Sequence, residues 1–131
     1  MADKKRKILV VDDEKALRGA LRDKLESEGF DVLEAKDGNE GLNKALAEHP
    51  DLILLDVMMP KMDGIEVMKK LQEDKWGKNA NMIMLTNVSD PIKVAEATET
   101  GSKNMTVYDY MIKSDWKLEE VVERVRTKLE K

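Results

Sequence analysis

Residues 52–60 read Leu-Ile-Leu-Leu-Asp-Val-Met-Met-Pro, an apolar run that carries one carboxylate, that of Asp56, to its end. A continuous apolar stretch of this length indicates a strand buried on both faces, which is typical of a parallel sheet. A carboxylate is costly to bury there unless a cationic group lies beside it. We therefore expect Asp56 to lie at the carboxyl edge of the sheet and to carry out chemistry rather than support the fold.

On both sides of this run, apolar strands alternate with amphipathic helices. Further strands are expected at residues 8–11, 30–35, 82–85 and 108–112. The helices between them place apolar residues on one face at a helical period: Ala16, Leu17, Ala20, Leu21 and Leu25; Leu42, Ala45 and Leu46; Ile65, Met68 and Leu71; and Leu118, Val121, Val122 and Val125. A weaker helix is expected at 92–98. The pattern predicts an α/β fold, a doubly wound parallel sheet of five strands with helices on both faces.

Composition limits the functions that the chain can have. Its 131 residues suffice for one domain, and a net charge of -4 argues against a primary nucleic-acid role. Cysteine is absent, which excludes disulfides and thiol nucleophiles, and the single histidine, His49, excludes a histidine-rich zinc site. We expect His49 to be a surface residue at the end of a helix. No signal peptide or membrane-spanning stretch is visible, so a cytoplasmic location is expected.

Polar residues follow the expected strands at the point where each strand ends. They are Asp12 and Asp13 after the first strand, Asp56 on the third, Thr86 after the fourth and Lys113 after the fifth. In parallel α/β sheets the functional site lies at the carboxyl ends of the strands, so these residues should converge on one edge. Alone, Asp12 and Asp13 could simply cap the first helix. Because Asp56 and Lys113 are expected at the same edge, we favour a functional site over helix capping.

The chemistry of this set indicates phosphoryl transfer. Three clustered carboxylates without histidine or cysteine suit Mg²⁺, and Lys113 and the Thr86 hydroxyl suit phosphoryl oxygens. The set holds no Ser, Cys or His nucleophile, so the attacking atom should be an oxygen of Asp56. The expected product is an aspartyl phosphate.

At five places the chain resembles the receiver domain of two-component response regulators. The matching motifs are VVDDE at 10–14, LLDVMMP at 54–60, MDG at 62–64, LT at 85–86 and YMIK at 110–113. The resemblance implies a flavodoxin-like (βα)5 fold with strand order 2-1-3-4-5. It covers about the whole chain, so residues 1–131 are expected to form one receiver domain with no output domain attached.

The resemblance also implies roles for individual residues. Asp56 matches the phosphoacceptor and Lys113 the lysine that pairs with the phosphate. Asp13 matches a direct Mg²⁺ ligand, Asp12 its partner acid, and the backbone carbonyl of Met58 the third protein ligand. The chain is thereby expected to catalyse only its own Mg²⁺-dependent phosphorylation and autodephosphorylation.

A switch is implied by two further matches. Thr86 matches the hydroxyl that moves toward the phosphoryl group, and Tyr110 the aromatic side chain that changes rotamer. Phosphorylation by a sensor histidine kinase or a phosphotransfer protein would then shift the surface made by residues 92–98, 108–112 and the last helix, and so control binding of a downstream protein. A monomer or a phosphorylation-dependent dimer is expected, with no nucleic-acid or membrane partner.

Two features depart from the family pattern. Lys113 is followed by Ser114 where the family usually carries a cis proline, and since a non-proline cis bond costs roughly 3 kcal/mol, we expect a trans bond here. Residues 101–107 form a polar stretch a few residues longer than the family's turn, which we interpret as a surface insertion.

Three other functions are alternatives to that of a receiver domain. A phosphohydrolase with an aspartate nucleophile needs a second acid two residues after Asp56, where the chain has Met58. A flavin-binding module needs a hydroxyl- and glycine-rich loop after the first strand, where the chain has Asp12-Asp13-Glu14. A degenerate receiver that binds partners without phosphorylation is the strongest alternative, and the intact acidic set argues against it.

Overall fold

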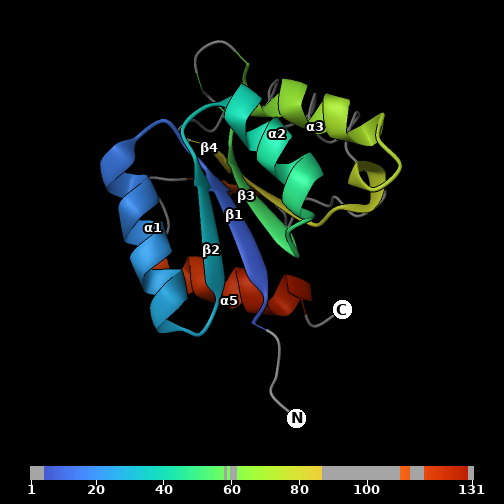
Figure 1. Cartoon of the computed structure of the whole chain (residues 1–131). Coiled ribbons are helices and arrows are strands. Elements are labelled where there is room, and N and C mark those ends of the chain that lie inside the picture. Colours follow the sequence, from blue (N-terminus) through green and yellow to red (C-terminus); the bar gives the residue numbers. More distant parts are fainter. Residues whose placement is uncertain (1–4, 58, 60–61, 87–109, 113–116, 130–131) are drawn as a thin grey trace.

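Five parallel strands form a single sheet in the order β2-β1-β3-β4-β5 (Figure 1). The computed structural model describes residues 5–57, 59, 62–86, 110–112 and 117–129. Within them the strands are β1 (Lys7–Val11), β2 (Asp31–Ala35), β3 (Leu52–Asp56), β4 (Met82–Thr86) and β5 (Tyr110–Ile112). The predicted fold class and strand order are confirmed.

Helices cover both faces of the sheet. They are α1 (Lys15–Ser27), α2 (Gly38–Glu48), α3 (Gly64–Gln72) and α5 (Leu118–Leu129), with a short 3₁₀ turn, η1 (Gly77–Asn79), after α3. Helices α1 and α5 lie on one face, and α2 and α3 on the other (Figure 1). In this part of the chain no helix is both long enough and apolar enough to cross a membrane. The helix expected at 92–98, the 101–107 stretch and the Lys113–Ser114 bond lie outside the described residues.

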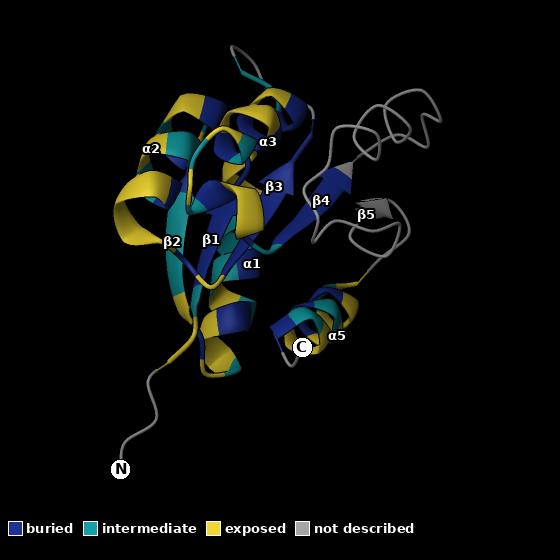
Figure 2. Cartoon of the chain, turned by 90° about the vertical axis from the view of Figure 1, so that its right-hand side faces the viewer, coloured by how far each residue is buried: buried dark blue, intermediate teal, exposed yellow. Residues whose placement is uncertain are grey.

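The two apolar faces of the sheet divide the core into two clusters. Successive residues of β3 alternate between them, because side chains of a strand point to opposite faces in turn. Ile53 and Leu55 pack beneath α2 and α3, whereas Leu52 and Leu54 pack beneath α1 and α5. All four side chains are buried, and the central strands are dark along their length in Figure 2. The prediction that β3 is buried on both faces is confirmed.

Local signals set the helix ends. Gly29 follows α1 with a φ of 96°, a left-handed conformation that glycine adopts without strain. The Asp37 carboxylate caps α2 by accepting a hydrogen bond from the Glu40 N–H at 2.8 Å. His49 ends α2 and is exposed, as expected, with its ring stacked on Trp76 at 4.4 Å between centroids. Leu46 was expected on the buried face of α2, but its side chain is 37% exposed.

Helix α5 is joined to the end of α1 by one arginine. The Arg126 guanidinium donates to the Glu28 carboxylate at 2.7 Å and lies 5.4 Å from the centre of the Phe30 ring. The Glu28 pKa is lowered, mainly by the hydrogen bond from Arg126. The contact ties the last helix to the loop that leads into β2.

Replacement by alanine should distinguish a buried leucine from an exposed one by its effect on the free energy of unfolding. We expect Leu54→Ala to lower the free energy of unfolding by about 3 kcal/mol, because it removes buried methyl groups and leaves a cavity between β3 and α5. Leu46→Ala is the matched control and should change it by about 0.5 kcal/mol or less. Urea denaturation of the two variants measures this, and equal losses would contradict the described packing of β3.

Candidate functional site

Three carboxylates meet at the carboxyl edge of the sheet. Asp12 and Asp13 directly follow β1, and Asp56 is the last residue of β3. These strands are neighbours, with Val11 paired to Leu55, so they end at the same level. One oxygen of each carboxylate lies within 4.8 Å of the others. The convergence predicted for these three residues is therefore confirmed.

Burial makes this cluster electrostatically costly. Asp12 is 0% and Asp56 1% exposed, whereas Asp13 is exposed. Negative charges held this close repel one another, and a divalent cation relieves the repulsion. The donors are all oxygen atoms, which suits Mg²⁺. The Asp12 Oδ1 atom also accepts a hydrogen bond from the Glu14 N–H at 2.9 Å, which orients this carboxylate at the start of α1.

The backbone around Asp56 is held from two sides. The Val57 N–H donates to the Leu85 carbonyl of β4 at 2.8 Å, and the Val57 carbonyl accepts from the Gly64 N–H at 2.9 Å. A Cβ atom at Gly64 would lie 2.9 Å from the Val57 Cα and would overlap the Asp56 carbonyl. Only glycine therefore allows the start of α3 to approach the end of β3 this closely. The tight contact fixes the direction in which the chain leaves Asp56.

A second glycine contact supports the same loop from α2. A Cβ atom at Gly38 would lie 2.8 Å from the Met62 Cβ and closer still to its carbonyl oxygen. The first residue of α2 thus packs directly against the backbone that leads from β3 into α3. Gly64 belongs to the MDG motif noted in the sequence, whereas the contact at Gly38 was not foreseen.

Sequence reasoning also missed an ion-pair network beside the acidic cluster. The Arg18 guanidinium donates to the Asp12 backbone carbonyl at 2.8 Å and to the Glu34 carboxylate at 3.0 Å. Arg22 donates to the other oxygen of Glu34 at 2.8 Å. The available signals were Arg18 and Arg22 one turn apart in α1 and an acid, Glu34, between apolar residues of β2.

The environment of Glu34 favours its charged form. Partial burial raises its pKa, but the hydrogen bonds and charges of Arg22 and Arg18 together outweigh this, so the pKa is lowered below the ordinary 4.5. The network is therefore fully charged at neutral pH.

The remaining predicted site residues are located only in part. By backbone register, Leu85 lies opposite Asp56, Thr86 opposite Ile112, and Tyr110 opposite Met84. The ends of β4 and β5 therefore reach the same edge as the acidic cluster. The side chains of Thr86 and Tyr110, and the whole of Met58 and Lys113, lie outside the described part of the chain.

Comparison with known protein families identifies the family to which a chain with this acidic cluster belongs. The sequence profile of the response regulator receiver domain matches residues 8–126. The chain belongs to the response regulator receiver domain family. Receiver domains are signalling switches of two-component phosphorelays rather than enzymes of metabolism, and the acidic cluster of this chain is consistent with phosphoryl acceptance.

Curated relatives of this receiver domain are longer proteins. The transcriptional regulatory protein PhoP of Bacillus subtilis, which is named for alkaline phosphatase synthesis, is 45% identical over 108 residues, which are 82% of this chain and 42% of PhoP. ResD of the same organism is 42% identical over 123 residues, 94% of this chain and 48% of ResD. The chain thus spans about half the length of the curated relatives it matches.

Solved structures of other receivers share the fold over nearly the whole chain. The chemotaxis protein CheY4 of Vibrio cholerae superposes with a TM-score of 0.84 at 29% identity, covering 95% of this chain and 98% of CheY4. A CheX–CheY complex of Borrelia burgdorferi that contains BeF₃ and Mg²⁺ gives a TM-score of 0.79 at 30% identity, covering 93% of this chain and 87% of the matched chain.

The repulsion within the acidic cluster makes a prediction about stability. In buffer with EDTA, Asp13→Asn should raise the urea midpoint above that of wild type, because it removes one of three mutually repelling charges. Saturating Mg²⁺ should reverse the order. Binding at about 100 times the dissociation constant adds about 2.7 kcal/mol, and Asp13→Asn should gain much less.

Asp31→Asn is the matched control for this test. Asp31 is an exposed aspartate at the start of β2, at the opposite edge of the sheet, so its replacement should leave the response to Mg²⁺ unchanged. An equal response to Mg²⁺ in wild type and Asp13→Asn would contradict a cation site at the acidic cluster.

The lowered pKa of Glu34 predicts a pH dependence of stability. Because the folded pKa lies below the ordinary 4.5, the ion pairs of Glu34 stabilise the protein fully above that value and lose their contribution as the pH falls through the folded pKa. The difference in unfolding free energy between wild type and Glu34→Gln should therefore be constant near neutral pH and shrink below pH 4.5. A difference that grows with acidification would contradict this.

Proposed function

We propose that this chain is a phosphorylation-controlled switch in which Asp56 accepts a phosphoryl group from the phosphohistidine of a sensor kinase or a phosphotransfer protein. The observation that supports this most strongly is the buried Asp56 carboxylate at the end of β3, clustered with Asp12 and Asp13. We further propose that residues 1–131 act as one receiver domain in the cytoplasm.

Asp56 is proposed to act as the nucleophile. One of its carboxylate oxygens attacks the phosphorus atom of a phosphohistidine whose other ring nitrogen is protonated. The bond from phosphorus to the donor nitrogen breaks, its electron pair stays on that nitrogen, and the imidazole leaves as a neutral group. Asp12, Asp13 and the Met58 backbone carbonyl are proposed to hold Mg²⁺ beside Asp56. When bound, Mg²⁺ supplies charge neutralisation for the carboxylates and the phosphoryl oxygens. The BeF₃ and Mg²⁺ in the Borrelia complex support this assignment.

The switch is proposed to use Lys113, Thr86 and Tyr110. Lys113 would pair with a phosphoryl oxygen, and the Thr86 hydroxyl would donate to another, while Tyr110 changes rotamer in response. The strand register supports this, because it places the backbone of Thr86 one residue beyond Leu85, the partner of Asp56. Ile112, the residue before Lys113, pairs with Thr86.

The output is proposed to be protein binding. The surface made by residues 92–98, β5 and α5 would change on phosphorylation and control a downstream protein, with the chain as a monomer or a phosphorylation-dependent dimer and with no nucleic acid bound by the receiver itself. The CheX–CheY complex among the structural neighbours shows a receiver bound to another protein, which supports this kind of output.

The acceptor role can be tested by intact mass. Incubation of wild type with acetyl phosphate and Mg²⁺ should add one phosphoryl group, and EDTA should prevent the addition, because the carboxylates then repel the donor. Asp56→Asn should show no adduct, since an amide oxygen is a poor nucleophile. Asp31→Asn should be phosphorylated like wild type and controls for a general effect of losing one negative charge.

Two outcomes would contradict the proposal. An adduct that persists in Asp56→Asn would place the acceptor elsewhere. No adduct on wild type, either with acetyl phosphate or with a phosphorylated histidine kinase domain, would favour the degenerate receiver that binds partners without phosphorylation.

A further inference from the structure

Arg18 lies between the acidic cluster and β2, and the proposed chemistry gives it no role. Its Nη1 donates to the Asp12 backbone carbonyl at 2.8 Å, and its Nε donates to the Glu34 carboxylate at 3.0 Å. The Arg18 side chain is 14% exposed, so most of it is removed from solvent. One partly buried guanidinium thus bridges the backbone of the acidic cluster and a carboxylate of the neighbouring strand.

The carbonyl that Arg18 contacts belongs to the peptide group joining Asp12 to Asp13. The Asp12 N–H on the other side donates to the Ala35 carbonyl of β2 at 3.1 Å. Because a peptide group is planar, fixing its oxygen fixes the direction in which the chain continues to Asp13. Asp13 is exposed and lies beyond the end of β1, so the Arg18 contact sets the position from which its side chain extends.

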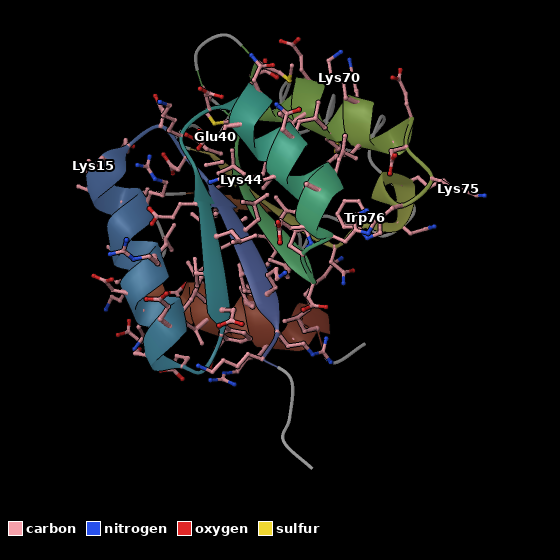
Figure 3. All side chains as sticks on the ribbon, viewed as in Figure 1. Lys15, Glu40, Lys44, Lys70, Lys75 and Trp76 are labelled. Carbon is pink, nitrogen blue, oxygen red and sulfur yellow. The ribbon has the colours of Figure 1, made fainter. Side chains whose placement is uncertain are left out.

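Glu34 holds the Arg18 guanidinium in this position. Its second oxygen accepts from Arg22 at 2.8 Å, and its backbone carbonyl accepts from Lys44 of α2, which Figure 3 shows reaching toward β2. An arginine beside three carboxylates forms bidentate pairs with them when nothing else engages it. The bond to Glu34 keeps the guanidinium on the backbone oxygen, so its charge stays off the oxygens that would bind a cation.

We propose that Arg18 is a positioning residue for divalent-cation binding, orienting the Asp12–Asp13 peptide while Glu34 holds its charge away from the carboxylates. The inference rests on the proposed metal site. It deepens that proposal by naming a residue outside the cluster on which cation affinity depends.

The direction in which Arg18→Ala changes the Mg²⁺ affinity distinguishes a positioning role from a purely electrostatic one. Arg18→Ala removes a positive charge next to the cluster, and by Coulomb's law alone this would strengthen Mg²⁺ binding. If Arg18 positions the acidic pair, the same substitution weakens binding instead. Loss of a group that orients metal ligands typically costs 10- to 100-fold in affinity, so we expect Arg18→Ala to bind Mg²⁺ about tenfold more weakly than wild type.

Arg22→Ala is the matched control. It removes the same kind of side chain, from the same helix and the same partner Glu34, but Arg22 has no hydrogen bond to Asp12 among those found in the described residues. Its Mg²⁺ affinity should stay within about twofold of wild type or increase slightly. Arg18→Lys keeps one donor for the Asp12 carbonyl and should recover most of the lost affinity.

Amide chemical shifts of the full chain, followed during a Mg²⁺ titration, measure all four proteins. The dissociation constant comes from the shifts of the residues at the cluster, and the metal-free spectra show whether the Asp13 amide has moved in Arg18→Ala and whether each variant is folded. Should Arg18→Ala not fold, Arg18→Met takes its place, because methionine keeps an apolar stem but has no donor for the Asp12 carbonyl, and it should bind Mg²⁺ more weakly than Arg22→Ala.

The outcomes are distinct. No Mg²⁺ binding by wild type would overturn the proposed metal site, and this inference with it. Binding by wild type together with equal or tighter binding by Arg18→Ala would overturn the positioning role alone, as would equal weakening in Arg18→Ala and Arg22→Ala. Weakening confined to Arg18→Ala and relieved in Arg18→Lys would establish it.

Discussion

The mutual repulsion of three carboxylates at one edge of the sheet is the constraint on which the rest of the structure depends. Asp12 and Asp56 are buried and Asp13 lies beside them, so the folded chain holds like charges that an unfolded chain would separate. β1 and β3 are adjacent parallel strands, and their pairing brings the three carboxylates to the same edge of the sheet. The hydrophobic core therefore sustains an arrangement that is unfavourable by itself and becomes favourable with a divalent cation.

Three backbone contacts hold the chain around this cluster. The start of α3 meets the end of β3 through Gly64, and the start of α2 meets the same loop through Gly38. On the remaining side, Arg18 reaches the Asp12 carbonyl from α1. Each contact involves backbone atoms rather than the carboxylates, so these contacts hold in place the chain that carries the acid side chains.

Much of this arrangement follows from the sequence. Alternating apolar strands and amphipathic helices indicate a parallel α/β sheet, and acids placed directly after strands indicate the shared edge. Leu46 shows the limit of periodicity, since it keeps the helical spacing yet is exposed. The contact of Gly38 with Met62 and the bond from Arg18 to Asp12 were not foreseeable, because both depend on how helices sit against the sheet and involve backbone atoms that carry no sequence signal.

The Arg126 contact has a mechanical consequence for α5. This residue lies in the last turn of the helix and binds Glu28 and the Phe30 ring at the edge of the sheet opposite the acidic cluster. Buried side chains, including Val121, Val122 and Val125, hold α5 against the sheet along its length, and the Arg126 contact adds a polar attachment in the last turn. Displacements that begin near the acidic cluster would therefore be larger at the first turn of α5 than at Arg126.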